Sequence, residues 1–110
     1  MVDDVGYFWL LIYPETTATE LHELDEDIAE SLWTMALHLG GVIKTHCNAA
    51  KINTATIGNM VPQLHVHIVA RHNDDDAWPQ TIWGRGDMKR LGETTKAVRL
   101  SAIQSWLGSM

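Results

Sequence analysis

Several features that mark secreted or membrane-spanning proteins are absent from this sequence. It contains one cysteine, Cys47, which excludes an intramolecular disulfide and a cysteine-based metal cluster within one chain. Its longest apolar run near the start, YFWLLIYP, is far too short to cross a membrane. The acidic segment before that run, MVDDVG, differs from the basic start of a secretion signal. We therefore expect a cytoplasmic protein that has no membrane partner.

Basic residues are also scarce. The 8 lysines and arginines are outnumbered by 14 aspartates and glutamates, which gives a formal net charge of -6. A protein that binds DNA or RNA needs a basic surface to neutralise phosphates, so we expect no nucleic-acid polymer as a partner. A small anionic ligand remains compatible with this charge, because a local site can be electropositive on an acidic protein.

The composition and length of the chain indicate a single folded domain. Hydrophobic residues make up 45% of the chain and charged residues 20%, which is typical of a soluble globular protein. A chain of 110 residues encloses one hydrophobic core and not two. No internal repeat or low-complexity linker divides it. We therefore predict one domain over residues 1–110.

The first half of the chain predicts a strand followed by a helix. Residues 6–13 are aromatic and aliphatic throughout and end at Pro14, which indicates a strand covered on both faces. Asp27, with Glu30 three residues later, resembles a capping box and predicts the start of the helix. The predicted apolar stripe of this helix comprises Ile28, Leu32, Met35, Leu39 and Ile43.

The second half predicts two paired strands and a final helix. Residues 51–57 and 63–71 alternate in the manner of strands, and the short turn GNMVP between them favours an antiparallel pair. Thr94 or Thr95 is expected to cap the final helix. This order of elements predicts an α+β fold, with an antiparallel sheet, one long amphipathic helix and a C-terminal helix. The apolar stripe predicted for the last helix comprises Val98, Ala102, Ile103 and Trp106.

Two histidines interrupt the apolar run of the last predicted strand, QLHVHIVAR. Side chains alternate between the faces of a strand, so Gln63, His65 and His67 share one face while the other face is apolar. A strand buried for packing alone does not need such a polar face. Three interpretations are open: the rings are structural and bond to the backbone, they bind a metal, or they act on a phosphate.

A metal site would use His65 and His67 as two nitrogen ligands for zinc or iron. A third ligand would then come from His72, from His46 or from one of the aspartates at 74–76. His72 has the wrong parity for the face of the pair if the strand runs on regularly, so this interpretation is not favoured. We expect no metal and no other cofactor.

A phosphate site would use the same pair differently. A neutral imidazole attacks phosphorus through one nitrogen when the other nitrogen keeps its proton in a fixed hydrogen bond. A neighbouring donor side chain then offsets the charge on the phosphoryl oxygens. One strand face supplies both groups.

The segment INTATIGNMVPQLHVHIVAR resembles the signature of the histidine triad (HIT) superfamily, His-φ-His-φ-His-φ-φ, where φ is apolar. The resemblance extends over about residues 6–84, because a strand ending in proline, an amphipathic helix, an asparagine-bearing strand, a glycine turn, the motif strand and a later Trp-Pro follow in the family's order. It implies a HIT-like fold and a homodimer that hydrolyses or transfers nucleotides. The substrates it implies are nucleotide conjugates, such as dinucleoside polyphosphates or nucleoside phosphoramidates.

The resemblance also implies roles for individual residues. His65 occupies the middle motif position, whose ring attacks the α-phosphorus and forms a nucleotidyl-histidine that water resolves. Gln63 supplies the backbone carbonyl that orients this ring, and His67 contacts phosphate oxygens. The residues implied to bind the nucleotide are Asn53, at the ribose or phosphates, and Gly58 and Asn59, in the turn that closes over the phosphates.

Three residues depart from the family pattern. Gln63 replaces the first motif histidine, Met60 replaces a small hydroxyl residue, and Trp9 stands where some members carry another histidine of the proton relay. These changes leave fewer groups that can protonate the leaving group. The alternative function is therefore a non-catalytic nucleotide-binding module, with a metal-dependent His-x-His enzyme third. An edge strand that the family has upstream is expected to be missing or shortened.

The segment after the motif, HNDDDAWPQTIWG, is acidic, aromatic and irregular. Trp78 and Trp83 supply area and stacking that suit a base pocket or a dimer seam, and equally the packing of a long loop. Residues 73–76, NDDD, are expected to form a solvated loop.

Overall fold

The fold is built on a three-stranded antiparallel sheet. The computed structural model describes residues 7–84 and 92–110. Its elements follow in the predicted order of strand, helix, strand, strand and helix, with one short 3₁₀ turn before the long helix. The α+β class is therefore confirmed. The elements are β1 (Trp9–Ile12), η1 (Leu21–Glu23), α1 (Glu26–Cys47), β2 (Lys51–Ala55), β3 (Val66–Arg71) and α2 (Glu93–Gly108).

β3 is the central strand of the sheet. It pairs antiparallel with β1 on one side and with β2 on the other. Trp9 of β1 and Asn53 of β2 both lie opposite Val69, and residues opposite one another on an antiparallel pair share a face. The predicted antiparallel pairing around the GNMVP turn is confirmed. Both strands are shorter than predicted, because the residues nearest the turn leave the hydrogen-bonded ladder.

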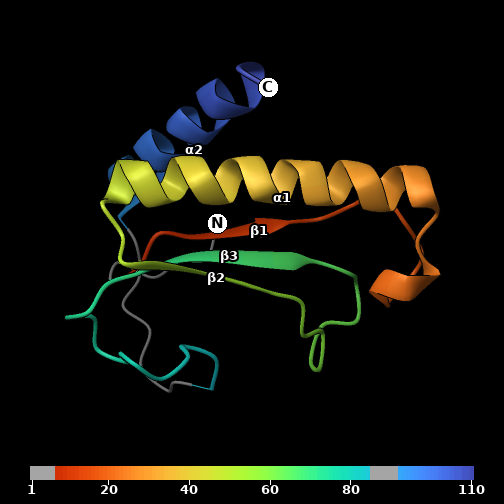
Figure 1. The fold of residues 1–110 in the computed structure, drawn as a ribbon, viewed down its shortest axis with the longest axis horizontal. Coiled ribbons are helices and arrows are strands. Elements are labelled where there is room, and N and C mark those ends of the chain that lie inside the picture. Colours follow the sequence, from red (N-terminus) through yellow and green to blue (C-terminus); the bar gives the residue numbers. More distant parts are fainter. Residues whose placement is uncertain (1–6, 85–91) are drawn as a thin grey trace.

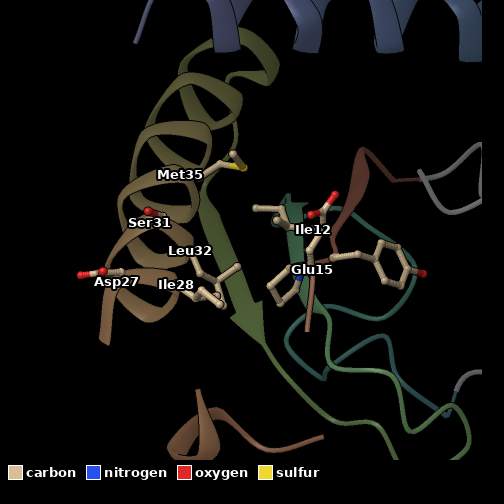
Figure 2. Close-up of a pocket in the computed structure, with 9 residues that line it drawn as sticks. Ile12, Glu15, Asp27, Ile28, Ser31, Leu32 and Met35 are labelled. Atoms are coloured by element: carbon tan, nitrogen blue, oxygen red, sulfur yellow. The ribbon is translucent and has the colours of Figure 1, made fainter. Parts of the chain in front are cut away.

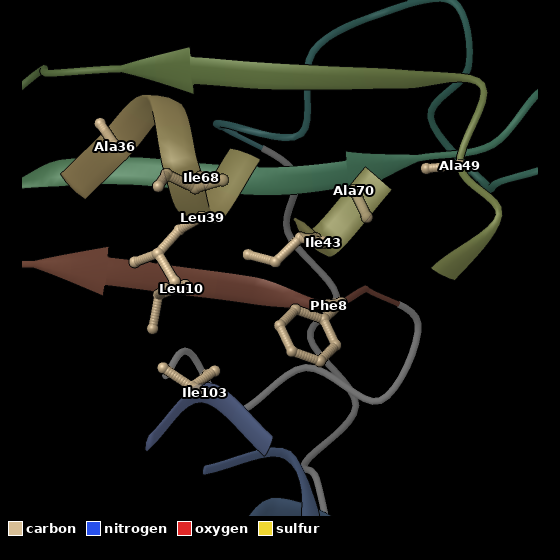
Figure 3. Close-up of a cluster of buried hydrophobic side chains, with 9 residues drawn as sticks. All are labelled: Phe8, Leu10, Ala36, Leu39, Ile43, Ala49, Ile68, Ala70 and Ile103. Atoms are coloured by element: carbon tan, nitrogen blue, oxygen red, sulfur yellow. The ribbon is translucent and has the colours of Figure 1, made fainter. Parts of the chain in front are cut away.

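Both helices lie on one side of the sheet (Figure 1). Side chains from α1, β1, β3 and α2 meet there in one apolar core (Figure 3). Burying each large side chain in such a core stabilises the fold by roughly 1.5–3 kcal/mol. The buried members are Phe8, Leu10, Ala36, Leu39, Ile43, Ala49, Ile68, Ala70 and Ile103.

The opposite face of the sheet is also covered. Residues 72–84 follow β3 and run beneath this face (Figure 1), where Ile82 packs with Trp9 and Val69. The first strand is therefore covered on both faces, as predicted, although it begins later than expected; Gly6, its predicted first residue, lies outside the described residues. The face that carries the two histidines is buried rather than polar and open.

Both predicted helix starts are wrong by a few residues. α1 begins directly after Asp25, so that Asp27 lies in its first turn. α2 begins directly after Gly92, which places Thr94 and Thr95 inside the helix. Neither N-cap residue makes a side-chain capping bond. The sequence does not separate the cap from the first turn, because an acidic side chain is favourable at both places.

The apolar stripe predicted for α1 is confirmed at its centre. Leu32, Leu39 and Ile43 are buried. The helix also continues through Gly40, where an added Cβ would lie 3.8 Å from Cγ2 of Ile52, an ordinary contact distance. Gly40 therefore marks a place where the helix lies close to β2 and not the end of the helix.

The stripe predicted for the C-terminal helix is confirmed only in part. Ile103 is buried, and Trp106 packs against the core. Val98 is 65% exposed, so its assignment to the stripe is wrong, and Leu107 contacts the core instead. No helix within residues 7–84 and 92–110 is long and apolar enough to cross a membrane.

Candidate active site

His65 stands immediately before β3, and the backbone fixes its ring. Its Nδ1 atom lies 2.7 Å from the carbonyl oxygen of Gln63, the contact that the resemblance implies. A carbonyl oxygen only accepts hydrogen bonds, so Nδ1 carries the proton and Nε2 of the neutral ring keeps its lone pair. The ring of Tyr13 stacks on the His65 ring with 5.6 Å between centroids. His65 is therefore held in the tautomer that a nucleophilic nitrogen requires.

Gln63 contributes to this arrangement through its backbone. Its side chain is exposed, whereas its carbonyl oxygen accepts the bond from His65. The side-chain difference from the family motif therefore leaves the orienting contact intact. Gln63 itself lies outside β3. The prediction that Gln63 shares one strand face with His65 and His67 is therefore wrong for Gln63.

His67 lies within β3, next to the first ring. The centroids of the two imidazoles are 4.9 Å apart, and the rings meet edge to face. Nδ1 of His67 lies 2.9 Å from Nε1 of Trp9 in the neighbouring strand. Burial, together with the neighbouring His65, lowers the pKa of His67 to about 4. His67 is therefore uncharged at neutral pH.

Both histidines line a cavity of about 510 Å³. The connection between β2 and β3 forms one wall, and the end of segment 72–84 forms another. The volume lies within the range of about 300–1,000 Å³ that is usual for small-molecule sites. The lining residues are Ile57, Gly58, Asn59, Met60, Val61, His65, His67, Trp83 and Gly84.

The connection between β2 and β3 depends on Gly58. Its φ angle is 70°, in the left-handed region that glycine adopts without a steric penalty. Gly58 and Asn59, the turn residues named by the resemblance, line the cavity of the two histidines. Met60 also lines it, with a side chain that is 95% exposed.

Asn53 lies on the same face of the sheet but is not among the residues that line the cavity. Its Oδ1 accepts a 2.8 Å hydrogen bond from Nη1 of Arg71. A guanidinium group only donates, so this contact fixes the orientation of the amide and turns the Nδ2 donors away from Arg71. A ligand that reaches Asn53 would therefore meet hydrogen-bond donors.

A buried ion pair joins the end of β3 to the segment that follows it. Nε and Nη2 of Arg71 lie 2.8 and 2.9 Å from the two carboxylate oxygens of Asp75, and the two side chains are 2% and 5% exposed. Nη2 also donates to the carbonyl oxygen of Gln80 at 2.7 Å. The expectation of a solvated NDDD loop is therefore wrong for Asp75, although its sequence neighbours Asn73 and Asp74 are exposed.

The charge of Asp75 is stabilised in this setting. Burial alone would raise its pKa, but hydrogen bonds from Arg71 and from the backbone of His72 and Trp78, with the charge of Arg71, hold the pKa at about 2. The pair thereby anchors segment 72–84 against the sheet. Nothing in the run of three aspartates distinguishes Asp75, so the sequence offered no signal for this contact.

The two tryptophans of segment 72–84 have different surroundings. Trp83 lines the cavity and meets the His67 ring edge-on, with 5.3 Å between centroids. Its Nε1 is buried and has no hydrogen-bond partner among the described residues. The guanidinium of Arg71 lies over the ring of Trp78, with 5.6 Å between Cζ of Arg71 and the ring centroid. Trp83 thus lies at the cavity of the two histidines, and Trp78 packs within the loop.

A metal site at His65 and His67 would need a third ligand, and the part of the chain that the structure describes offers none. No group of three or more His, Cys, Asp or Glu side chains comes together there with the spacing that a metal ion needs. Asp75, the aspartate that contacts the last residue of β3, is bound by Arg71.

A second cavity, of about 410 Å³, lies between α1 and the chain that follows β1 (Figure 2). Its walls are mostly apolar and include Ile12, Ile28, Leu32 and Met35. Neither His65 nor His67 lines it. Tyr13, which stacks on His65, lines this cavity as well, so the two cavities are neighbours on either side of that residue.

Paired histidines at the central strand, with one ring fixed by a backbone carbonyl beside a glycine turn, define a site of the histidine triad class. The family model described as HIT domain matches residues 6–74, more than half of the 110 residues. The chain belongs to the histidine triad family. No curated protein matches the chain. Family membership supports a function of the nucleotide-binding or nucleotidyl-transfer type.

Crystal structures of bacterial histidine triad proteins are similar to this one. Histidine triad protein blr8122 from Bradyrhizobium japonicum is 35% identical with a TM-score of 0.88, over 94% of this chain and 78% of that chain. A histidine triad protein from Marinobacter aquaeolei VT8 is 28% identical with a TM-score of 0.92, over 99% and 80%. SMc02904 from Sinorhizobium meliloti 1021 is 29% identical with a TM-score of 0.91, over 96% and 78%. The fold is therefore that of the family.

Proposed function

We propose that this protein cleaves nucleotide conjugates at the α-phosphorus, as a nucleotide phosphohydrolase or nucleotidyl transferase, with His65 as the nucleophile. The observation that carries the proposal is the 2.7 Å hydrogen bond between His65 Nδ1 and the Gln63 carbonyl oxygen. It leaves Nε2 unprotonated in a ring that lines the cavity. The proposed substrates are dinucleoside polyphosphates or nucleoside phosphoramidates.

The proposed reaction has two steps. In the first, Nε2 of His65 forms a bond to the α-phosphorus, and the leaving group departs with the electrons of its bond to phosphorus. The ring becomes a cationic nucleotidyl-histidine, and its Nδ1 proton stays in the hydrogen bond to Gln63. In the second step, water attacks the same phosphorus and releases a proton, the N–P bond breaks, and its electron pair returns to Nε2. The products are a nucleoside monophosphate and the leaving group.

Neutral hydrogen-bond donors are proposed to stabilise the phosphoryl oxygens. Among the described residues that line the cavity there is no lysine and no arginine, so in this part of the chain the proposed stabilisation comes from N–H groups aimed at the developing charge. His67 contacts the oxygens from the strand, while Gly58 and Asn59 contact them from the connection between β2 and β3. The Nδ2 donors of Asn53 suit the ribose or a phosphate oxygen.

The family resemblance supports a wider set of proposals. We propose one domain over residues 1–110 that works as a cytoplasmic homodimer without a cofactor. The net charge of -6 supports a small-molecule substrate over a nucleic-acid polymer.

The alternative is a non-catalytic nucleotide-binding module. It is favoured by the exposed Gln63 side chain, which replaces a motif histidine, and by Met60 at the cavity. Such a module would bind the same conjugates and leave them intact. Catalysis therefore has to be measured separately from binding.

Hydrolysis of a dinucleoside tetraphosphate in ¹⁸O-labelled water tests the proposed function. Attack at the α-phosphorus places the label in the nucleoside monophosphate, which mass spectrometry of the products detects. A label found in the nucleoside triphosphate would show attack at the β-phosphorus and contradict the proposal. Binding without hydrolysis of any conjugate would establish the alternative module.

Gln63→His is expected to raise the rate mainly for substrates with poor leaving groups. An amide side chain cannot transfer a proton, and general acid catalysis is worth on the order of 10²-fold or more for a leaving group that needs protonation. The measurement is kcat/KM for conjugates of one nucleotide with leaving groups of graded pKa. We expect a steep dependence on leaving-group pKa in the wild-type protein and a shallower one in the variant.

The matched control is Gln104→His, which places the same side chain on the exposed surface of α2. It should reproduce the steep wild-type dependence. A flat dependence in both the wild type and Gln63→His would mean that protonation does not limit the rate, and that Gln63 has only a structural role.

A further inference from the structure

A hydrogen bond from Trp9 to His67 determines which ring nitrogen of His67 carries the proton. Nε1 of Trp9 lies 2.9 Å from Nδ1 of His67, and both groups are buried. An indole nitrogen donates and does not accept. Nδ1 of His67 must therefore be the acceptor, and the single proton of the neutral ring must sit on Nε2.

The pairing of β1 with β3 explains why this contact forms. Trp9 lies opposite Val69, and His67 lies opposite Leu11, so Trp9 and His67 are diagonal neighbours on one sheet face. A large aromatic side chain spans such a diagonal distance. The Trp83 ring lies nearly perpendicular to the Trp9 ring, with 6.3 Å between centroids, and contacts His67 as well.

The surroundings of His67 do not favour a positive charge on its ring. The rings in contact with it belong to Trp9, His65 and Trp83, and Ala55 faces it from β2. None of these groups is an anion. Among the described residues, the carboxylate of Asp75 near the end of β3 is bound to Arg71, which lies four residues beyond His67. A second ring proton would point an N–H of His67 at the N–H of Trp9.

We propose that Trp9 is a positioning residue that holds His67 neutral and protonated at Nε2. His67 then offers one hydrogen bond to a phosphoryl oxygen and does not deliver a proton to the leaving group. The second of these statements rests on the proposed function, whereas the tautomer assignment does not. The two histidines of the site would thus have opposite tautomers, with the proton on Nδ1 in His65 and on Nε2 in His67.

The role fits the position of Trp9 in the sequence. Where some family members carry a histidine of the proton relay, this chain has a side chain that only donates a hydrogen bond. Such a residue cannot pass a proton to His67 or take one from it. The replacement therefore converts a relay position into one that fixes a neutral donor.

The test is nitrogen NMR of the histidine rings in the wild-type protein and in Trp9→Phe, without any ligand. In the wild type, His67 should show an unprotonated Nδ1 with a through-hydrogen-bond coupling to Nε1 of Trp9, and His65 the opposite tautomer. Trp9→Phe should give a mixture of His67 tautomers and raise the pKa of His67 by about one unit, the equivalent of one lost hydrogen bond.

Trp83→Phe is the matched control. It removes an indole that contacts the same ring but donates no hydrogen bond to it, so the His67 tautomer should stay as in the wild type. A protonated Nδ1 on wild-type His67, or a His67 pKa near 6.5 in the wild type, would overturn the proposal even if Trp9→Phe does not fold. A tautomer and pKa unchanged in Trp9→Phe would also overturn it.

The pH dependence of kcat/KM tests the proposed role of His67 in the reaction. In Trp9→Phe the ionisation that belongs to His67 should move up by about one pH unit, because the loss of the indole donor lets His67 accept a proton more readily. The same profile in both proteins would overturn the assigned role of His67 in the reaction. Absence of any turnover in the wild type, with the expected NMR result, would count against the proposed function and leave the tautomer assignment standing.

Discussion

His65→Ala is expected to reduce turnover of nucleotide conjugates by roughly 10⁴-fold or more, the scale seen when a nucleophile is removed. The variant should still bind the nucleotide nearly as well as the wild type, because the lost atoms form a bond to phosphorus only during the reaction. His67→Ala should weaken both binding and turnover, because that ring is proposed to contact the phosphate in the ground state as well. The measurements are kcat and KM, with the Kd of a nucleoside monophosphate by calorimetry.

The matched control is His22→Ala, which removes an exposed histidine from η1. It should leave kcat, KM and Kd unchanged. Turnover in His65→Ala equal to that of His22→Ala would remove His65 from the mechanism and leave the binding module as the better account.

Arg71→Met is expected to lower the free energy of unfolding by about 3–5 kcal/mol, as the loss of one partner from a buried ion pair does. The substitution leaves the Asp75 carboxylate buried without its partner, since the two side chains are 2% and 5% exposed. It also removes donors from Asn53 and Gln80. The measurement is urea denaturation followed by tryptophan fluorescence.

Two further variants separate the buried charge from other effects. Lys44→Ala removes an exposed cation from the last turn of α1 and should change stability by no more than about 1 kcal/mol. The double variant Arg71→Met with Asp75→Asn should recover part of the loss, because it removes the unpaired charge. A destabilisation by Arg71→Met no larger than that by Lys44→Ala would contradict the structural role of the pair.

The pH dependence of stability follows from the same carboxylate. The pKa of Asp75 is lowered from 3.8 to about 2 in the folded protein, so the folded state binds this proton less readily than the unfolded state. The stabilisation is therefore complete above the unfolded pKa and is lost as the pH falls from about 4 to about 2. The wild type should lose more stability than Arg71→Met over this interval.

Much of the fold was predictable because it depends on short-range patterns. The alternation of residues 51–57 and 63–71 around a glycine turn predicted their antiparallel pairing, which the structure confirms. The helical spacing of Leu32, Leu39 and Ile43 predicted the buried face of the long helix. The backbone carbonyl of Gln63 was named from the family motif, and the contact depends only on residues two apart.

The remaining features depend on contacts between distant parts of the chain. Trp9 and His67 are 58 residues apart, and their contact requires the register of β1 on β3, which no local pattern specifies. Of three neighbouring aspartates, Asp75 pairs with Arg71 because the fold of segment 72–84 under the sheet brings its carboxylate to the guanidinium. The start of α1 was misplaced because an acidic side chain suits both a cap and a first turn, and the start of α2 because Gly92 takes the cap position ahead of Thr94 and Thr95.

The most direct test of the central claim is to trap the covalent intermediate on His65. The protein is mixed with a nucleotide conjugate, quenched within milliseconds without acid, and analysed by intact mass spectrometry and peptide mapping. The account predicts a mass increase of one nucleoside monophosphate residue, located on the peptide that carries His65 and absent from His65→Ala. Turnover of the same conjugate with no adduct at any quench time, or an adduct on another residue, would contradict it.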